Sequence, residues 1–137
     1  TANIEYRQSM YISLNLSNSQ LTQQNENVIV FGFGYKNKNF RFPFSLFNGA
    51  TLNNDLTFKV DFSLRDNKTL IYQADIPGAQ VSSGAQNITY RPEVDYVINQ
   101  RFNLSLFYDS NITRPYTSQT FNTAFTNFGI NLKLLLQ

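Results

Sequence analysis

Alternation of apolar and polar side chains over residues 52–65 constrains the fold of this chain more than any other feature. Every second residue from Leu56 to Leu64 is large and apolar, and the residues between them are polar or charged. A period of two is the signature of a β-strand, because successive side chains point to opposite faces. The stretch is longer than the five or six residues that are usual in a strand. We therefore interpret it as a membrane-crossing strand of a β-barrel.

The same alternation recurs along the chain and predicts about seven long strands. The predicted strands cover residues 3–17, 28–36, 52–65, 69–76, 86–98, 102–112 and 125–137, of which 69–76 alternates least well because Ile71 falls on the wrong face. The connections are predicted from polar residues and from Pro or Gly: a turn at 18–27, an ordered loop at 37–51, a turn at 66–68, a loop at 77–85, a turn at 99–101 and a loop at 113–122. Outer-membrane barrels have short periplasmic turns and longer external loops. On that pattern the C-terminus is periplasmic, the loop at 37–51 is external and the turn at 18–27 is periplasmic.

Charged residues in these strands fall on one face, and none falls on the apolar face. A lysine or arginine on a lipid-facing surface at mid-bilayer would cost roughly 2–4 kcal/mol, so this separation favours a membrane. The predicted lumen-facing residues are Glu5, Arg7, Lys36, Asp55, Lys59, Asp61, Arg65, Arg91, Glu93, Asp95 and Lys133. The predicted lipid-facing residues are Ile12, Leu14, Phe31, Phe33, Phe58, Val60, Phe62, Leu104, Leu106, Ile130, Leu132 and Leu134.

Aromatic side chains recur near the ends of the apolar faces, as in the interfacial girdles of barrels. The residues expected toward the outside are Tyr6, Tyr35, Tyr90, Tyr108 and Phe128, and those expected toward the periplasm are Phe62, Tyr96 and Phe102.

Composition excludes several functional classes. The chain has no cysteine and no histidine, so the usual nucleophile–base pairs are absent and we expect no enzyme, no metal site and no cofactor. Glu93 and Asp95 form a same-face carboxylate pair beside Arg91, which we interpret as a solvated salt cluster. The net charge of +2 gives no indication of nucleic-acid binding. No run approaches the ~18 apolar residues of a transmembrane helix.

Two alternatives to a large barrel remain on these residues alone. A soluble β-sandwich binding module also alternates, with its apolar face turned inward. The C-terminal strands of another outer-membrane transport barrel, of the TonB-dependent receptor type, would alternate in the same way. Seven strands is an odd number, and an open edge in lipid leaves main-chain groups unpaired. We therefore expect residues 1–137 to be one all-β, antiparallel transmembrane segment, the C-terminal part of a larger barrel. The absence of an initiating methionine or a signal peptide before Thr1 agrees with a processed or partial chain.

Several segments, spread over nearly the whole chain, resemble the C-terminal region of the SprA/Sov family. They are residues 18–22, 30–36, 52–56, 62–69, 101–104, 106–109 and 126–130. The most specific of them is Arg65-Asp66-Asn67-Lys68-Thr69. The last strand is similar to the C-terminal signal of the barrel assembly machinery, although it ends in Leu136-Gln137 rather than in an aromatic residue.

The resemblance implies a function and a set of partners. The family forms the giant outer-membrane barrel of the type IX secretion system of Gram-negative bacteria, a translocon that exports folded proteins, including gliding adhesins. It implies a lateral opening in the barrel wall, occupied by a PorV-type shuttle barrel or by a plug protein. The other implied partners are the remaining strands of the barrel, the secreted cargo and the lipid bilayer.

Overall fold

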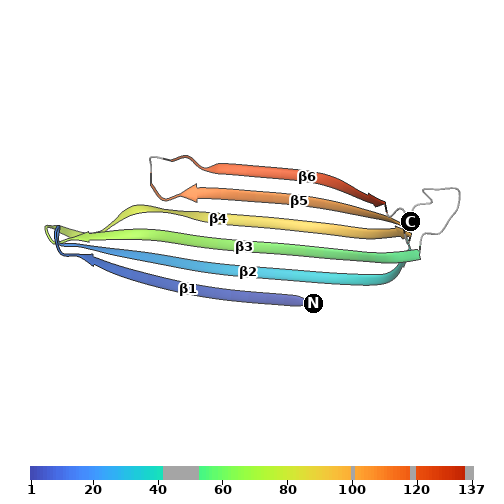
Figure 1. The fold of residues 1–137 in the computed structure, drawn as a ribbon, viewed down its shortest axis with the longest axis horizontal. Helices are drawn as coiled ribbons and strands as arrows, with labels where there is room; N and C mark the ends of the chain where they lie inside the picture. Colours follow the sequence, from blue (N-terminus) through green and yellow to red (C-terminus); the bar gives the residue numbers. More distant parts are fainter. Residues whose placement is uncertain (42–52, 100, 118–119, 135–137) are drawn as a thin grey trace.

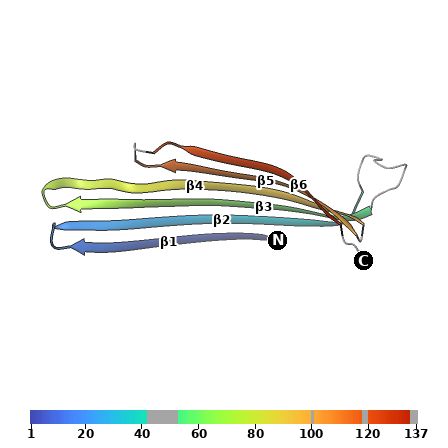
Figure 2. The same cartoon turned by 45° about the horizontal axis from the view of Figure 1, so that its top comes forward.

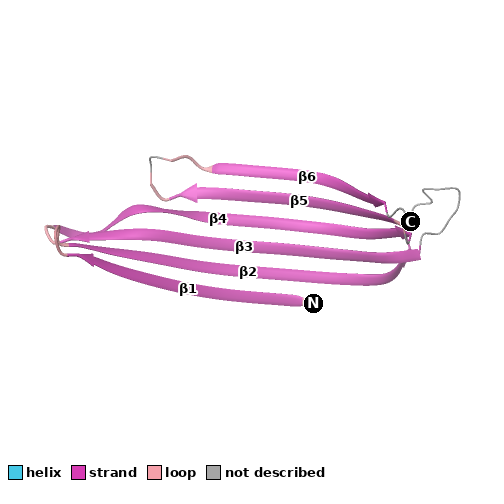
Figure 3. Cartoon of the chain, in the orientation of Figure 1, coloured by secondary structure: helices cyan, strands magenta, loops and turns pink. Residues whose placement is uncertain are grey.

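The computed structural model of this chain describes residues 1–41, 53–99, 101–117 and 120–134. They form one sheet of six antiparallel strands, ordered as in the sequence, and this part of the chain contains no helix (Figure 3). The strands are β1 Ala2–Asn15, β2 Gln20–Arg41, β3 Asn53–Gln73, β4 Ile76–Asn99, β5 Phe102–Pro115 and β6 Thr123–Leu134. The all-β class predicted from the sequence is confirmed.

The sheet is a single open layer (Figures 1 and 2). No second layer covers either face within the described residues, and β1 and β6 are its two edges. Val28 and Tyr96, at 5% and 6% exposure, are the only buried apolar side chains in this part of the chain. The accessible surface of 10272 Å² exceeds the roughly 7300 Å² expected for a compact monomer of 15.8 kDa. The described part of the chain therefore has two faces and no core of its own.

The register of the strands decides which side chains share a face. Residues directly opposite one another on antiparallel strands point to the same side. Phe31 lies between Ile4 and Phe62 on its two neighbours, and Phe62 in turn lies opposite Tyr90. One position along, Gly32 lies opposite Asp61, which belongs to the other face. The period of two in the sequence thus continues from strand to strand.

The strand number predicted from the sequence is wrong by one, because β3 and β4 are single long strands. The predicted turn at 66–68 lies inside β3, and the predicted loop at 77–85 lies inside β4. The stretch 69–76, predicted as a separate strand, contains the end of β3, a turn at 74–75 and the first residue of β4. The predicted turn at 18–27 is likewise mostly β2, which begins at Gln20. Main-chain hydrogen bonds hold these segments in the sheet although they do not alternate regularly between apolar and polar residues, so the loss of apolar alternation did not mark a strand end.

Having one strand fewer also changes which connections share an end of the sheet. The turns after β1 and β3 lie at one end, which we call the hairpin end, and β5 also runs toward this end but stops well short of it (Figure 1). β2, β4 and β6 all finish at the other end, which we call the C-terminal end. The predicted loop at 37–51 and the predicted turn at 18–27 were therefore assigned to the wrong ends relative to the C-terminus. Residues 37–41 of that loop belong to β2, and the rest lies outside the described residues.

Gly84 lies close to a bulge in β4 and has a backbone conformation that favours glycine. Its φ is +135°, and the pairing with β3 shifts register next to it. A Cβ added there would lie 2.3 Å from the main-chain oxygen of Asn67, which cannot move without disrupting the ladder. The side chain of Asn67 accepts a hydrogen bond of 2.7 Å from the Ala85 amide and so fixes the bulge from the β3 side.

We predict that Gly84→Ala lowers the free energy of unfolding by roughly 2–4 kcal/mol, because a strained backbone and a clash add together. The matched control is Gly78→Ala. Gly78 also has a positive φ, of +98°, but a Cβ there meets nothing within 4 Å. The Gly78→Ala substitution should lower the free energy of unfolding by only about 1–2 kcal/mol. Urea titration of the folded protein, followed by circular dichroism, measures both, and equal costs would contradict the clash.

Candidate functional site

The first face of the sheet carries a continuous band of apolar side chains, which we call the apolar belt. Its members lie opposite one another across all six strands and include no charged residue. The belt consists of Ile4, Tyr6, Ile29, Phe31, Phe33, Tyr35, Leu56, Phe58, Val60, Phe62, Leu64, Ile88, Tyr90, Pro92, Val94, Tyr96, Phe102, Leu104, Leu106, Tyr108, Phe128, Ile130, Leu132 and Leu134. Phe33 and Phe58 meet edge to face at 6.4 Å between ring centroids, as do Tyr90 and Tyr108 at 6.3 Å. The members on the edge strands β1 and β6 are exposed, for example Ile130 at 58%, whereas most of those on β3, β4 and β5 are half-buried.

The belt ends before the sheet does. Toward the hairpin end, Leu64 is followed on the same face by Asp66 and Lys68, and β5 places Arg114 opposite Gln86 there. The expectation that no charge shares the apolar face is therefore wrong for the whole strands, although it holds within the belt. The error arose because residues 66–68 and 113–122 were assigned to connections.

Ten of the twelve predicted lipid-facing residues belong to the belt. Ile12 and Leu14 share its face, but Gln8 and Met10 lie between them and Tyr6 on β1. They group instead with Leu21 and Leu70 near the hairpin end. A polar stripe thus separates two apolar zones on one face.

Two of the predicted girdle aromatics lie at the opposite end from the one expected. Phe62 sits beside Tyr90, toward the hairpin end of the belt. Tyr35 sits opposite Phe58, nearer to the C-terminal end. The aromatics that do mark the C-terminal end on β4 and β5 are Tyr96 and Phe102. The error in strand number produced both misplacements, because it reversed the direction assigned to the first three strands.

Ion pairs between neighbouring strands cross the second, polar face. Lys36 Nζ lies 2.8 Å from Asp55 Oδ2, which joins β2 to β3. At the hairpin side, Arg65 Nε lies 3.2 Å from Glu26 Oε1 across the same two strands. Arg91 Nη2 and Asp109 Oδ2, 2.9 Å apart, join β4 to β5. These pairs are partly exposed, so each contributes at most about 1 kcal/mol.

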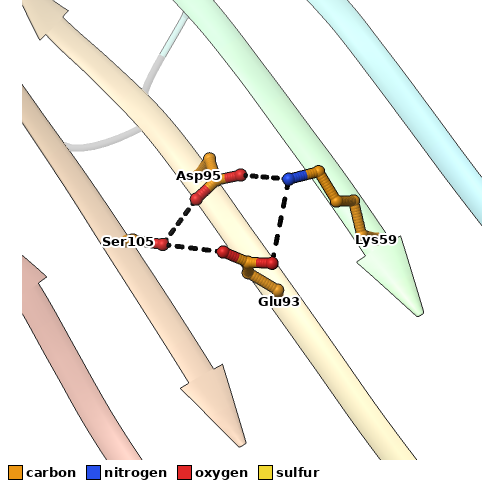
Figure 4. A network of polar contacts seen from close by, with 4 residues as sticks. All are labelled: Lys59, Glu93, Asp95 and Ser105. Atoms are coloured by element: carbon orange, nitrogen blue, oxygen red, sulfur yellow. Dashed lines mark hydrogen bonds and ion pairs between the residues drawn. The ribbon is translucent and has the colours of Figure 1, made fainter. Parts of the chain in front are cut away.

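The densest group on this face joins three strands around Lys59 (Figure 4). Its ammonium lies 2.9 Å from Asp95 Oδ2 and 3.7 Å from Glu93 Oε2. On the far side of β4, the Ser105 hydroxyl of β5 hydrogen-bonds both carboxylates (Figure 4). One cation and one hydroxyl therefore hold two carboxylates. The predicted salt cluster is present, but its cation is Lys59 and not Arg91, which pairs with Asp109 instead.

All eleven predicted lumen-facing residues lie on this polar face by register. Within the described chain, Glu5, Arg7, Asp61 and Lys133 make no ion pair, whereas the other seven do. Sequence reasoning missed the role of Glu26, because its segment was assigned to a turn. It also missed that Asp109 reaches Arg91, since only the register between strands brings the two together.

Two glycines on the polar face leave space that side chains from neighbouring strands fill. The ring of Phe107 lies over Gly129 on the neighbouring strand, where an added Cβ would come within 2.3 Å of it. The Asn3 side chain similarly covers Gly32. Among the described residues, no group of three or more acidic, histidine or cysteine side chains is placed to hold a metal ion. The face presents a hydrated surface of balanced charge rather than an enclosed ligand site.

Comparison with known proteins adds no relative. No protein-family model matches the chain, and no curated protein matches it. In the part of the chain that the structure describes, there is no helix of the length and apolarity needed to span a membrane. Fold and faces together define an all-β chain whose open antiparallel sheet is apolar on one side and charged on the other.

We predict that Lys59 and Asp95 are energetically coupled. In a double-mutant cycle with Lys59→Met and Asp95→Asn, urea titration should give a coupling free energy of about 0.2–1 kcal/mol, reduced by added salt. Arg7→Met combined with Asp95→Asn is the control, because Arg7 lies on β1 and the two effects should add. Additive effects in both cycles would show that the network of Figure 4 contributes nothing to stability.

Proposed function

We propose that this chain is a wall segment of a very large outer-membrane protein-conducting channel, the translocon of a type IX secretion system. The observation that carries the proposal is the apolar belt, flanked by polar residues and backed by a charged face. From Leu56 to Leu64 the belt runs about 27 Å along β3, at roughly 3.3 Å per residue. With strands tilted by 35–45°, this becomes about 20 Å across the membrane, close to the ~25 Å band of outer-membrane barrels.

The open edges support the view that the segment belongs to a larger closed wall. Main-chain groups on the outer sides of β1 and β6 have no strand partner among the described residues. In a bilayer each unpaired group would cost several kcal/mol, so neighbouring strands of the same barrel must cover both edges. We therefore include the remaining strands among the partners of this chain.

The polar face supports a role in passing proteins rather than one small solute. Its charges have both signs and pair with one another, as Lys36 does with Asp55 and Arg91 does with Asp109. A wall of balanced charge keeps water without strongly attracting cargo of either sign, which suits varied folded proteins. No catalytic step is proposed. The resemblance to the SprA/Sov family is the reason for naming this translocon, with a PorV-type shuttle and a plug protein as further partners. The periplasmic C-terminus stays part of the proposal only through the similarity of the last strand to the barrel-assembly signal, because the short turns at 16–19 and 74–75 lie at the opposite end of the sheet.

We predict that Val60→Arg or Leu132→Arg blocks membrane assembly, because each places a charge in the belt at a cost of roughly 2–4 kcal/mol. Lys59→Ala and Lys133→Ala, one position away on the polar face, should assemble normally. The measurement is the amount of full-length protein in the outer-membrane fraction. Equal tolerance of both pairs would contradict the assigned facing.

We also predict that exported protein passes along the polar face. A photocrosslinking amino acid at Asp61, which has no ion pair in the described chain, should capture secreted cargo in living cells. The same residue at Val60, on the opposite face, should capture none. If the crosslinker at Asp61 captures only proteins that deliver small solutes, and no secreted protein, the result would favour a transport barrel of the TonB-dependent receptor type instead.

A further inference from the structure

We infer that the belt face carries a binding line for phosphate-bearing lipid headgroups, formed by Lys68, Arg114 and Tyr116 at the hairpin end of the belt. The inference rests on the proposed membrane location and adds a ligand class to it. We call these three residues the headgroup line. They lie on the opposite face of the sheet from the cations of the polar face, which are directed away from lipid.

The first argument is depth. Lys68 is four residues beyond Leu64 on β3, which is about 13 Å along the strand and about 10 Å along the membrane normal at a tilt near 40°. Arg114 pairs with Gln86, whose β3 partner is Asp66, one row nearer to the belt. A headgroup layer extends roughly 5–7 Å beyond the hydrocarbon on each side. A flexible lysine or arginine side chain at these positions reaches that layer.

The second argument is free charge. On the polar face Lys36, Lys59, Arg65 and Arg91 each have a carboxylate within 4 Å. On the belt face, and within the described residues, Lys68 and Arg114 have none. No carboxylate of the described residues occupies these two cations. Both are therefore available to bind an anion that comes from outside the chain.

The third argument is that Tyr116 organises this line and shields the one nearby carboxylate. Its amide donates a hydrogen bond of 3.0 Å to the Gly84 carbonyl, and its hydroxyl donates one of 2.7 Å to Asp66. That hydrogen bond to a carboxylate raises the pKa of the Tyr116 phenol above its ordinary value. Lys68 Nζ lies 5.3 Å from the centre of the Tyr116 ring, a cation–π contact that holds the ammonium beside the ring rather than on Asp66. Tyrosine itself favours the membrane interface.

The geometry also sets the spacing of the site. Lys68 and Arg114 are two strands and one row apart, which places their Cα atoms about 12 Å from each other. Two such charges contact separate phosphate groups, on one large headgroup or on two adjacent lipids. Gly84 pairs with Lys68 on one side and accepts the hydrogen bond from the Tyr116 amide on the other, and because it has no side chain, Tyr116 can reach Asp66 across β4.

The test uses the full-length protein in nanodiscs of phosphatidylcholine with and without phosphatidic acid. Native mass spectrometry counts the phosphatidic acid molecules that stay bound. We expect each of Lys68→Gln and Arg114→Gln to weaken retention about fivefold, and the double variant roughly 25-fold. Lys133→Gln is the matched control, since it removes an unpaired cation from the polar face and should change nothing.

Equal retention in the double variant and in Lys133→Gln would overturn the inference. Displacement of the bound lipid by millimolar inorganic phosphate would also overturn it, because the site would then recognise the free anion and not a headgroup. Tyr116→Phe removes the hydrogen bond to Asp66 but keeps the ring, and we expect it to lose part of the retention. If the wild-type protein enters nanodiscs but shows no preference for phosphatidic acid, only this inference fails. If it does not enter nanodiscs at all, the proposed membrane function fails with it.

Discussion

The antiparallel register is the constraint on which every other feature depends. Side chains on a pleated strand alternate with a period of two, so a slip of one residue would exchange the two faces. With the pairing observed between β2 and β3, Phe31 meets Phe62 and Val28 meets Arg65. A slip of one position between these strands would carry Arg65 onto the belt side of its neighbour. The belt face and the polar face are therefore consequences of one register, held by main-chain hydrogen bonds along strands of twelve to twenty-four residues.

Side chains add specificity to that register without a core to support them. Ion pairs such as Lys36–Asp55 and Arg91–Asp109 link neighbouring strands on the polar face, and the ring contact of Phe33 with Phe58 does so on the belt face. Each is worth about 1 kcal/mol or less, because the sites are open to solvent. These ion pairs and ring contacts join the four central strands, β2 to β5, so together they contribute more than any one of them. Irregularities act in the opposite sense: the pairing of β4 shifts register between Val81 and Ser83, next to Gly84, and again near each of its ends.

The sequence alone predicted the all-β class and the two faces, because a period of two needs no tertiary information. The segments 56–64, 102–108 and 128–134 lie in strands as expected. It did not predict that β3 and β4 continue to a turn at 74–75. There Asn67, Lys68 and Gln80 look like turn and loop residues, but the main chain pairs them regardless of their side chains. That single error changed the strand number from six to seven and reversed the ends assigned to Tyr35 and Phe62. The ion-pair partners were equally hidden, since Arg91 and Asp109 meet only through the register of β4 with β5.

The two bare edges of the sheet have a consequence for how the protein is made. β1 offers fourteen residues of main chain on its outer side, and β6 offers twelve. A long, open edge is a template for any other extended chain, including a second copy of this one. The described residues form no core, so strand pairing and cross-strand contacts alone hold the sheet together. In the barrel proposed above, both edges would have to be kept from pairing with the wrong polypeptide until neighbouring strands cover them.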